Sequence, residues 1–166
     1  GWRMCGHPSF QGSSLKKLEQ WHACPIHFNY RSFLGDVLTE VSAAYPVSGL
    51  VINYTGLGLR GGSLEDWPFC FCDDCCRRYY EDFEGDLVAE AVRGRTDLIR
   101  NWQLDKVREQ LVYLRHRISR IRPGLTLICR ATPHWTNRSN CRMRLDSGHV
   151  LVEWPPLLDD GILDEL

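Results

Sequence analysis

The sequence predicts an α/β fold built on parallel strands, and three features of the chain carry this prediction. Two short, continuous apolar runs, residues 49–52 and 125–129, have the composition of strands that are buried on both faces. Between them, residues 97–122 form the longest amphipathic pattern of the chain, which indicates a helix. Because helical connections between neighbouring strands are right-handed crossovers, the two strands should be parallel.

A helix is expected directly before the first strand, over residues 30–45. Asn29 is suited to cap its N-terminus and Pro46 to end it. One face of this helix carries apolar side chains at intervals of three and four residues: Phe33, Leu34, Val37, Leu38, Val41 and Ala44. A helix that runs straight into a buried strand is half of a βαβ unit.

Shorter elements complete the predicted order of the chain. Two helices are expected over residues 74–83 and 87–92, with Gly85 between them. A third apolar run, residues 149–152, indicates another strand, and residues 155–160 should begin a short helix. No repeat or linker divides the sequence, so residues 1–166 are expected to form a single α/β domain.

Composition excludes several classes of protein. The chain of 166 residues is 43% hydrophobic and 25% charged, as expected for a globular domain rather than a disordered or fibrous chain. Its 20 basic and 21 acidic residues give a net charge of -1, which offers no general attraction to nucleic acid or to an anionic membrane. No apolar run reaches the roughly 18 to 20 residues of a membrane-spanning helix. We therefore expect neither a nucleic-acid nor a membrane partner.

The eight cysteines are distributed unevenly. Four lie within seven residues, and the others (Cys5, Cys24, Cys129 and Cys141) are scattered. This spacing is not that of a disulfide framework, and it favours a reducing compartment such as the cytoplasm. Thiolates at C-x-x-C spacing suit zinc, which makes Cys70, Cys72 and Cys75 candidate ligands within the segment that ends at Cys76.

A zinc site at Cys70, Cys72 and Cys75 would need a fourth ligand, and a metal-free explanation of these cysteines is also open. Sequence neighbours such as Cys75 and Cys76 rarely bind one ion together, so the fourth ligand should come from elsewhere, with His7, His134 and Cys141 as candidates. In the alternative, no metal is bound. The cysteines are then reduced side chains that pack the loop, or two of them form one local disulfide.

Polar and aromatic residues follow the predicted strands, at the end where α/β proteins place their sites. Asp66 and Trp67 lie in the long loop after the first strand, and His134-Trp135 follow the second. Glu153-Trp154 directly follow the third apolar run. Carboxylates supply acid and base groups, and indole rings stack on sugar faces, so these positions suit a carbohydrate.

From Cys24 onward, several short segments resemble a known family when taken in order. They are Cys24-Pro25, Tyr30-Arg31-Ser32-Phe33, Tyr45, Ser48-Gly49-Leu50 and Cys70-Phe71-Cys72-Asp73-Asp74-Cys75. This order resembles the bacterial glycoside-hydrolase-like (β/α)8 barrels, which are putative glycosyl hydrolases related to β-galactosidase and α-L-fucosidase barrels. The resemblance implies a barrel-like fold, with this chain a partial TIM barrel or a divergent member.

On the glycoside-hydrolase hypothesis, the polar and aromatic residues that follow the predicted strands would have specific roles. Glu153 would be the catalytic acid or base, with Asp66 as the partner carboxylate of a glycoside hydrolase. Asn53 stands where the family has a carboxylate at the strand end, so it would orient a hydroxyl rather than exchange a proton. The other implied contacts to the sugar are Trp67, His134, Trp135 and Trp154.

Whether the chain is an enzyme stays open at this point. The main hypothesis is a glycoside hydrolase-like domain that acts on or binds a glycan. The first alternative is a carbohydrate-binding barrel without catalysis, or a fragment of one. The second is a small cysteine-rich domain that binds metal and serves in interactions, with no cofactor other than zinc at residues 70–76.

Overall fold

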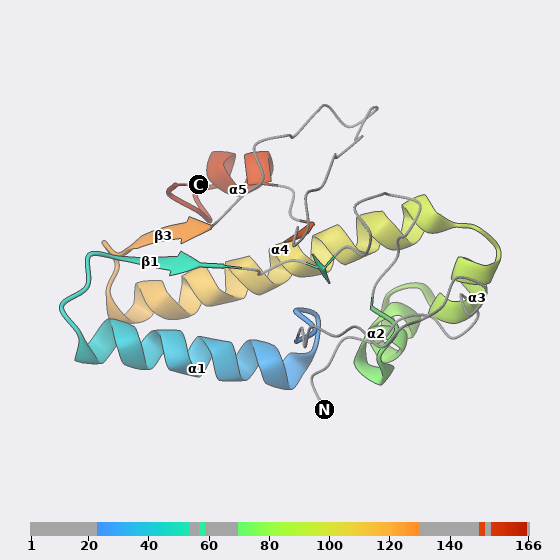
Figure 1. Cartoon of the computed structure of the whole chain (residues 1–166), viewed down its shortest axis with the longest axis horizontal. Coiled ribbons are helices and arrows are strands. Elements are labelled where there is room, and N and C mark those ends of the chain that lie inside the picture. Colours follow the sequence, from blue (N-terminus) through green and yellow to red (C-terminus); the bar gives the residue numbers. More distant parts are fainter. Residues whose placement is uncertain (1–22, 54–56, 59–69, 130–149, 152–153, 166) are drawn as a thin grey trace.

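The computed structural model describes residues 23–53, 57–58, 70–129, 150–151 and 154–165. In this part of the chain helices predominate (Figure 1). The helices are α1 (Phe28–Ala44), α2 (Asp73–Phe83), α3 (Leu87–Val92), α4 (Thr96–Ile121) and α5 (Trp154–Asp159). The strands are β1 (Gly49–Ile52), β2 (Leu57–Gly58), β3 (Thr126–Cys129) and β4 (Val150–Leu151).

The strands form two separate pairs. β1 and β3 are parallel, with Leu50 opposite Leu127 and Ile52 opposite Cys129. The C-terminal segment lies along β3 as well, because the Cys129 amide donates to the Glu165 carbonyl at 3.2 Å. β2 and β4 make a short antiparallel pair of their own.

The predicted (β/α) barrel, and with it the partial TIM barrel, is wrong. A barrel of this kind closes eight parallel strands inside a ring of helices. The described chain instead pairs only β1 and β3 in its parallel sheet. Between these two strands, three helices occupy the described sequence, and the apolar run over residues 149–152 contributes the antiparallel strand β4 rather than another parallel strand. The glycoside-hydrolase assignment rested on the barrel and loses its structural basis.

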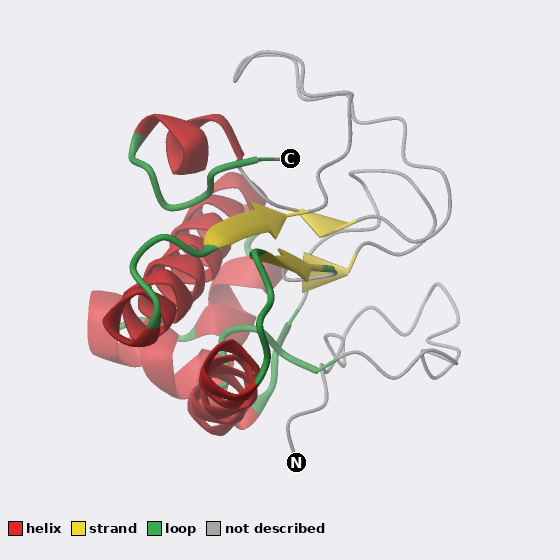
Figure 2. Ribbon diagram, turned by 90° about the vertical axis from the view of Figure 1, so that its left-hand side faces the viewer, coloured by secondary structure: helices red, strands yellow, loops and turns green. Residues whose placement is uncertain are grey.

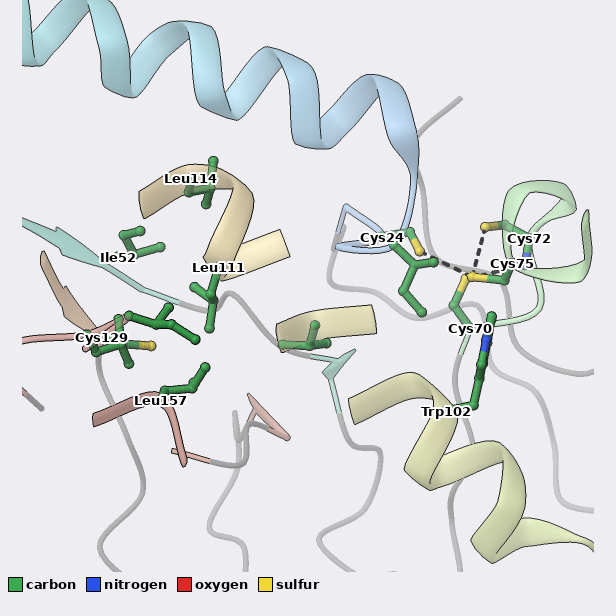
Figure 3. Packing of buried hydrophobic residues seen from close by; sticks show 14 of the residues in the cluster. Cys24, Ile52, Cys70, Cys72, Cys75, Trp102, Leu111, Leu114, Cys129 and Leu157 are labelled. Carbon is green, nitrogen blue, oxygen red and sulfur yellow. Dashed lines mark hydrogen bonds between the residues drawn. The ribbon is translucent and has the colours of Figure 1, made fainter. Parts of the chain in front are cut away.

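Helix α4 is the central element of the core. Figure 1 shows it running along the length of the molecule, and in Figure 2 the helices gather to one side of the strands. Its buried apolar side chains are Ile99, Trp102, Leu104, Val107, Leu111, Leu114 and Ile118. Figure 3 shows Leu111 and Leu114 close to Ile52 of β1, with Cys129 of β3 and Leu157 of α5 in the same cluster.

In the described part of the chain β1 is not buried on both faces, which differs from the sequence prediction. Leu50 and Ile52 are buried, while Val51 between them is 63% exposed. A continuous apolar run therefore does not mean burial on both faces here, since the two buried positions alternate as in a strand with one covered face.

Two small residues bring α1 against α4. Gly35 is buried, and a Cβ atom at this position would lie 3.0 Å from Cε1 of Tyr113 and 3.1 Å from Cδ of Arg117. Ser42, one face-repeat further along α1, is fully buried and its hydroxyl donates to the Leu38 carbonyl at 2.7 Å. The absence of larger side chains at these positions allows the two helices to approach closely.

The start and the outer face of α1 differ from prediction. His27 caps the helix in place of Asn29, since its Nδ1 atom accepts a hydrogen bond from the Asn29 amide at 3.2 Å. Phe33, predicted on the buried face, is 49% exposed, whereas Leu34 and Leu38 pack against the core. The small residues, not the aromatic ring, mark the side that meets α4.

None of the helices in the described ranges is both long enough and apolar enough to cross a membrane.

Replacing Gly35 by leucine should separate α1 from α4 and destabilise the fold. Overpacking of this kind costs about 1–3 kcal/mol of unfolding free energy, measured by denaturant titration. Gly124→Leu is the matched control, because a Cβ at Gly124 meets nothing within 4 Å. The control should change stability by no more than about 0.5 kcal/mol. Equal effects of the two substitutions would contradict the close α1–α4 contact.

Candidate metal centre

Four cysteine side chains from two distant parts of the chain converge in the interior. Cys24 lies just before α1, and Cys70, Cys72 and Cys75 lie at the start of α2. Their sulfur atoms all lie within 4.8 Å of one another. The sulfur of Cys75 is 3.5 Å from the sulfur of Cys24 and 3.5 Å from that of Cys72 (Figure 3). We refer to these four residues as the four-cysteine cluster.

The entry into α2 places three of the four sulfurs. Cys72 is the N-cap residue, in extended backbone conformation, and Cys75 lies three residues further on the same side of the first turn. The Cys72 amide donates to the Cys70 sulfur at 3.4 Å, which turns this side chain, two residues before the cap, towards the cluster. The sequence C-x-C-x-x-C thus becomes a local three-sulfur arrangement at a helix N-terminus.

The fourth sulfur is brought in by contacts between the starts of α1 and α2. The Phe28 amide donates to Oδ2 of Asp74 at 2.9 Å. Arg78 donates from Nη1 to the Ile26 carbonyl at 3.2 Å and also pairs with Glu109 of α4 at 2.8 Å. These contacts hold the segment that carries Cys24 against α2 independently of the sulfur atoms.

The cluster is shielded from water by apolar neighbours. Cys24, Cys70 and Cys75 have no exposed surface and Cys72 is 7% exposed. Trp102 of α4 lies beside the cluster in Figure 3, and Tyr79 meets its ring edge to face at a centroid distance of 5.1 Å. Such a shell lowers the local dielectric response, so that charge inside the cluster must be compensated locally.

The four thiols cannot all ionise on their own. Hydrogen bonding with Cys24, and then with Cys70 and Cys75, lowers the pKa of Cys72. Hydrogen bonding within the same group, together with burial, raises the pKa of Cys70 and of Cys75. One thiolate is thus stabilised at the expense of its neighbours, and a bound cation is what would allow several thiolates to coexist.

The geometry suits a tetrahedral metal ion. Zinc–thiolate bonds of about 2.3 Å place neighbouring sulfurs of a tetrahedral site about 3.8 Å apart. The observed sulfur separations of 3.5 Å for two pairs, within a limit of 4.8 Å for all pairs, bracket that distance. The four-cysteine cluster can therefore hold a metal ion such as zinc.

The structure brings the predicted ligands Cys70, Cys72 and Cys75 together but adds a residue that the sequence did not suggest. Cys24 is the fourth member, whereas the candidates His7, His134 and Cys141 lie outside the described residues. One feature of the sequence could have suggested Cys24. Structural zinc sites draw their ligands from separated segments, and Cys24 lies before the first predicted helix, far in sequence from residues 70–75.

The structure also shows where Cys76 lies and whether the cysteines form the local disulfide of the alternative prediction. The sulfur of Cys76 donates to the Phe71 carbonyl at 3.9 Å and does not belong to the cluster. Burial, followed by the nearby sulfur of Cys72, raises the pKa of Cys76 to about 11. Among the six cysteines in the described ranges no two form a disulfide with each other.

The residues predicted to contact a sugar are not brought together by the described structure. Asn53 follows β1 and is exposed. Trp154 is the first residue of α5. Asp66, Trp67, His134, Trp135 and Glu153 lie outside the described residues. Their roles remain predictions.

No family model matches the chain, and a search of curated proteins finds no match either. The resemblance to glycoside-hydrolase-like barrels therefore receives no support from relatives. The four-cysteine cluster is the feature that remains to indicate a function.

Asp74→Ala should destabilise the domain by about 1–2 kcal/mol, because it removes the acceptor of the Phe28 amide and the partner of Arg77 at 2.6 Å. Asp73→Ala is the matched control, since Asp73 is the exposed neighbour in the same helical turn. Denaturant titration of both variants measures the difference. Equal loss of stability would contradict the role given to Asp74.

The contribution of Asp74 should depend on pH. Partial burial raises its pKa, but hydrogen bonds from Arg77 and from the Phe28 amide outweigh burial and lower it. A carboxyl with a lowered folded-state pKa stabilises fully above its unfolded pKa of about 4, and this stabilisation is lost as the pH falls through the folded value. The stability gap between the Asp74→Ala and Asp73→Ala variants should therefore be constant near neutral pH and shrink below about pH 4.

Proposed function

We propose that this chain is a small metal-binding domain in which Cys24, Cys70, Cys72 and Cys75 hold one zinc ion in a structural site. The observation that carries the proposal is the convergence of four buried sulfurs within 4.8 Å from two parts of the chain. Free cysteines buried singly are common in protein interiors, but four sulfurs within 4.8 Å of one another are not explained by apolar packing alone.

The donor set favours zinc over the harder divalent ions. Thiolate sulfur is a soft ligand, so a site of four sulfurs disfavours magnesium and calcium, which prefer oxygen. Four cysteines around one ion is also a common closed arrangement for structural zinc. A catalytic zinc keeps one position for water or substrate, and four protein sulfurs would leave none.

The protein supplies more than the four sulfurs. The Cys72 amide, directed at the Cys70 sulfur, would stabilise negative charge there. The N-terminus of α2 carries a partial positive charge at the same place. Both features favour thiolates over thiols and so favour metal binding.

Zinc at this site would act by stabilising the fold. Cys24 and Cys75 are 51 positions apart in sequence, and one ion would join them across the starts of α1 and α2. Because such a site does not exist in the unfolded chain, the free energy of zinc binding adds to the free energy of folding. The function would then be the presentation of a metal-stabilised surface, not chemistry at the ion.

The purified chain should contain one zinc ion per molecule, and Cys75→Ser should lose it. Removing a thiolate ligand should weaken zinc binding at least about 100-fold, the upper end of what is lost when only a supporting residue is changed. Elemental analysis and competition with a chelator measure the content and the affinity. The melting temperature of the Cys75→Ser variant should fall, since binding energy and folding energy are shared.

Cys76→Ser provides the matched control for this test. It changes the next residue of the same helix by the same chemistry, but the Cys76 sulfur lies outside the cluster. The control should retain one zinc ion with unchanged affinity. Zinc-free protein from metal-supplemented growth, or equal zinc loss in the two variants, would contradict the proposed site.

A further inference from the structure

The members of the four-cysteine cluster differ in how they are exposed and connected. Cys72 retains 7% of its surface, while Cys24, Cys70 and Cys75 retain none. Cys72 and Cys75 also belong to the same first turn of α2, with their sulfurs 3.5 Å apart (Figure 3). An oxidant arriving from solvent therefore meets Cys72 first.

The surroundings of Cys72 favour its reaction with an oxidant. The reactive form of cysteine is the thiolate, and thiolate character at a helix N-terminus is increased by the helix dipole. Cys72 occupies the N-cap position of α2, a helix of eleven residues.

Cys75 is placed to complete a disulfide with Cys72. Residues three apart in a helix have Cα atoms about 5 Å apart, a separation that a disulfide can span. Cys24 also lies 3.5 Å from Cys75, but neither of these two residues is exposed to accept the first oxygen. The disulfide formed first should therefore be local to α2 and should not link α1 to α2.

We propose that Cys72 is an oxidative modification site of the zinc centre, at which a peroxide forms a Cys72–Cys75 disulfide and thereby releases the metal and frees Cys24. This inference rests on the proposed zinc site. The site would then have two states. In the reduced state one zinc ion joins the starts of α1 and α2, and in the oxidised state the zinc is gone and Cys24 is no longer linked to α2.

The chemistry balances with hydrogen peroxide as the oxidant. The Cys72 thiolate attacks one peroxide oxygen, the O–O bond breaks, the other peroxide oxygen leaves as hydroxide, and Cys72 becomes a sulfenic acid. The Cys75 thiolate then attacks the Cys72 sulfur, the S–O bond breaks, and a second hydroxide leaves. The two sulfurs together lose two electrons and the peroxide gains two. Two protons convert the hydroxides to water, and two more convert Cys24 and Cys70 to thiols as Zn²⁺ departs.

Freeing Cys24 would leave the two helix starts joined by contacts without sulfur. Among these are the hydrogen bond from Phe28 to Asp74 and the one from Arg78 to Ile26. A disulfide between Cys24 and Cys75 would instead keep the two segments joined. Which disulfide forms therefore decides whether oxidation removes the link between the starts of α1 and α2 or replaces it by a covalent bond.

The test uses the full chain loaded with zinc. Zinc content is measured first in the reduced protein. This step tests the proposed zinc site before any oxidation. Hydrogen peroxide is then added, released zinc is followed with a coloured chelator, and the products are mapped by tryptic digestion and mass spectrometry. Cys72 and Cys75 fall in the tryptic peptide 61–77 and Cys24 in the peptide 18–31. A Cys72–Cys75 disulfide therefore lowers the mass of one peptide by about 2 Da, whereas a Cys24–Cys75 disulfide joins two peptides. Because peptide 61–77 also contains Cys70 and Cys76, fragmentation of this peptide is needed to show that Cys72 and Cys75 are the bonded pair.

The expected result is loss of one zinc ion per chain together with the disulfide inside peptide 61–77, both reversed by dithiothreitol and added zinc. A disulfide that joins the two peptides, zinc release with only sulfinic or sulfonic products, or zinc that stays bound in peroxide would each overturn this inference while leaving the zinc site intact. Reduced protein without zinc would overturn the proposed site and this inference with it.

A pair of substitutions separates the role of Cys72 from general loss of a ligand. Cys72→His and Cys70→His each leave three cysteines and one histidine, a ligand set that also holds structural zinc. Both should bind zinc, but peroxide should release it at least about tenfold more slowly from Cys72→His, because the reactive thiolate is gone. Cys70→His also loses one thiolate ligand but keeps Cys72, so peroxide should release its zinc faster than that of Cys72→His. Equal release from the two variants would contradict the assignment of Cys72.

Discussion

The convergence of four buried sulfurs within 4.8 Å of one another is the constraint that governs the candidate metal centre. Within a shell that includes Trp102 and Tyr79, the four-cysteine cluster has little solvent to stabilise charge. The Cys72 amide and the N-terminus of α2 favour thiolates, yet close sulfurs raise the cost of ionising one another. A soft divalent ion would resolve this conflict, and the same ion would fix Cys24 against α2.

The core has two parts that α4 connects. At one end the helix presents Trp102 to the four-cysteine cluster, and further along it presents Leu111 and Leu114 to β1, β3 and α5 (Figure 3). Among the described residues the parallel sheet is small, and Val51 of β1 is exposed. A zinc ion in the four-cysteine cluster would add a cross-link at the other end of this core, which is the role we assign to the cluster.

Local elements could be read from the sequence, but their arrangement could not. Apolar periodicity predicted a helix over residues 97–122, close to the observed Thr96–Ile121, because an amphipathic stripe is a local property. The barrel was wrong because an apolar run such as residues 149–152 does not say which strand it will pair with. Likewise C-x-C-x-x-C revealed three cluster members, whereas Cys24 joins them through packing between the starts of α1 and α2, which no local pattern encodes.

Zinc K-edge X-ray absorption of the purified, reduced chain tests the central claim most directly, since it reports the ligand atoms around the ion itself. The account predicts four sulfur neighbours at about 2.3 Å and no nitrogen or oxygen in the first shell. A shell containing nitrogen or oxygen, or fewer than four sulfurs, would contradict a zinc site made of Cys24, Cys70, Cys72 and Cys75.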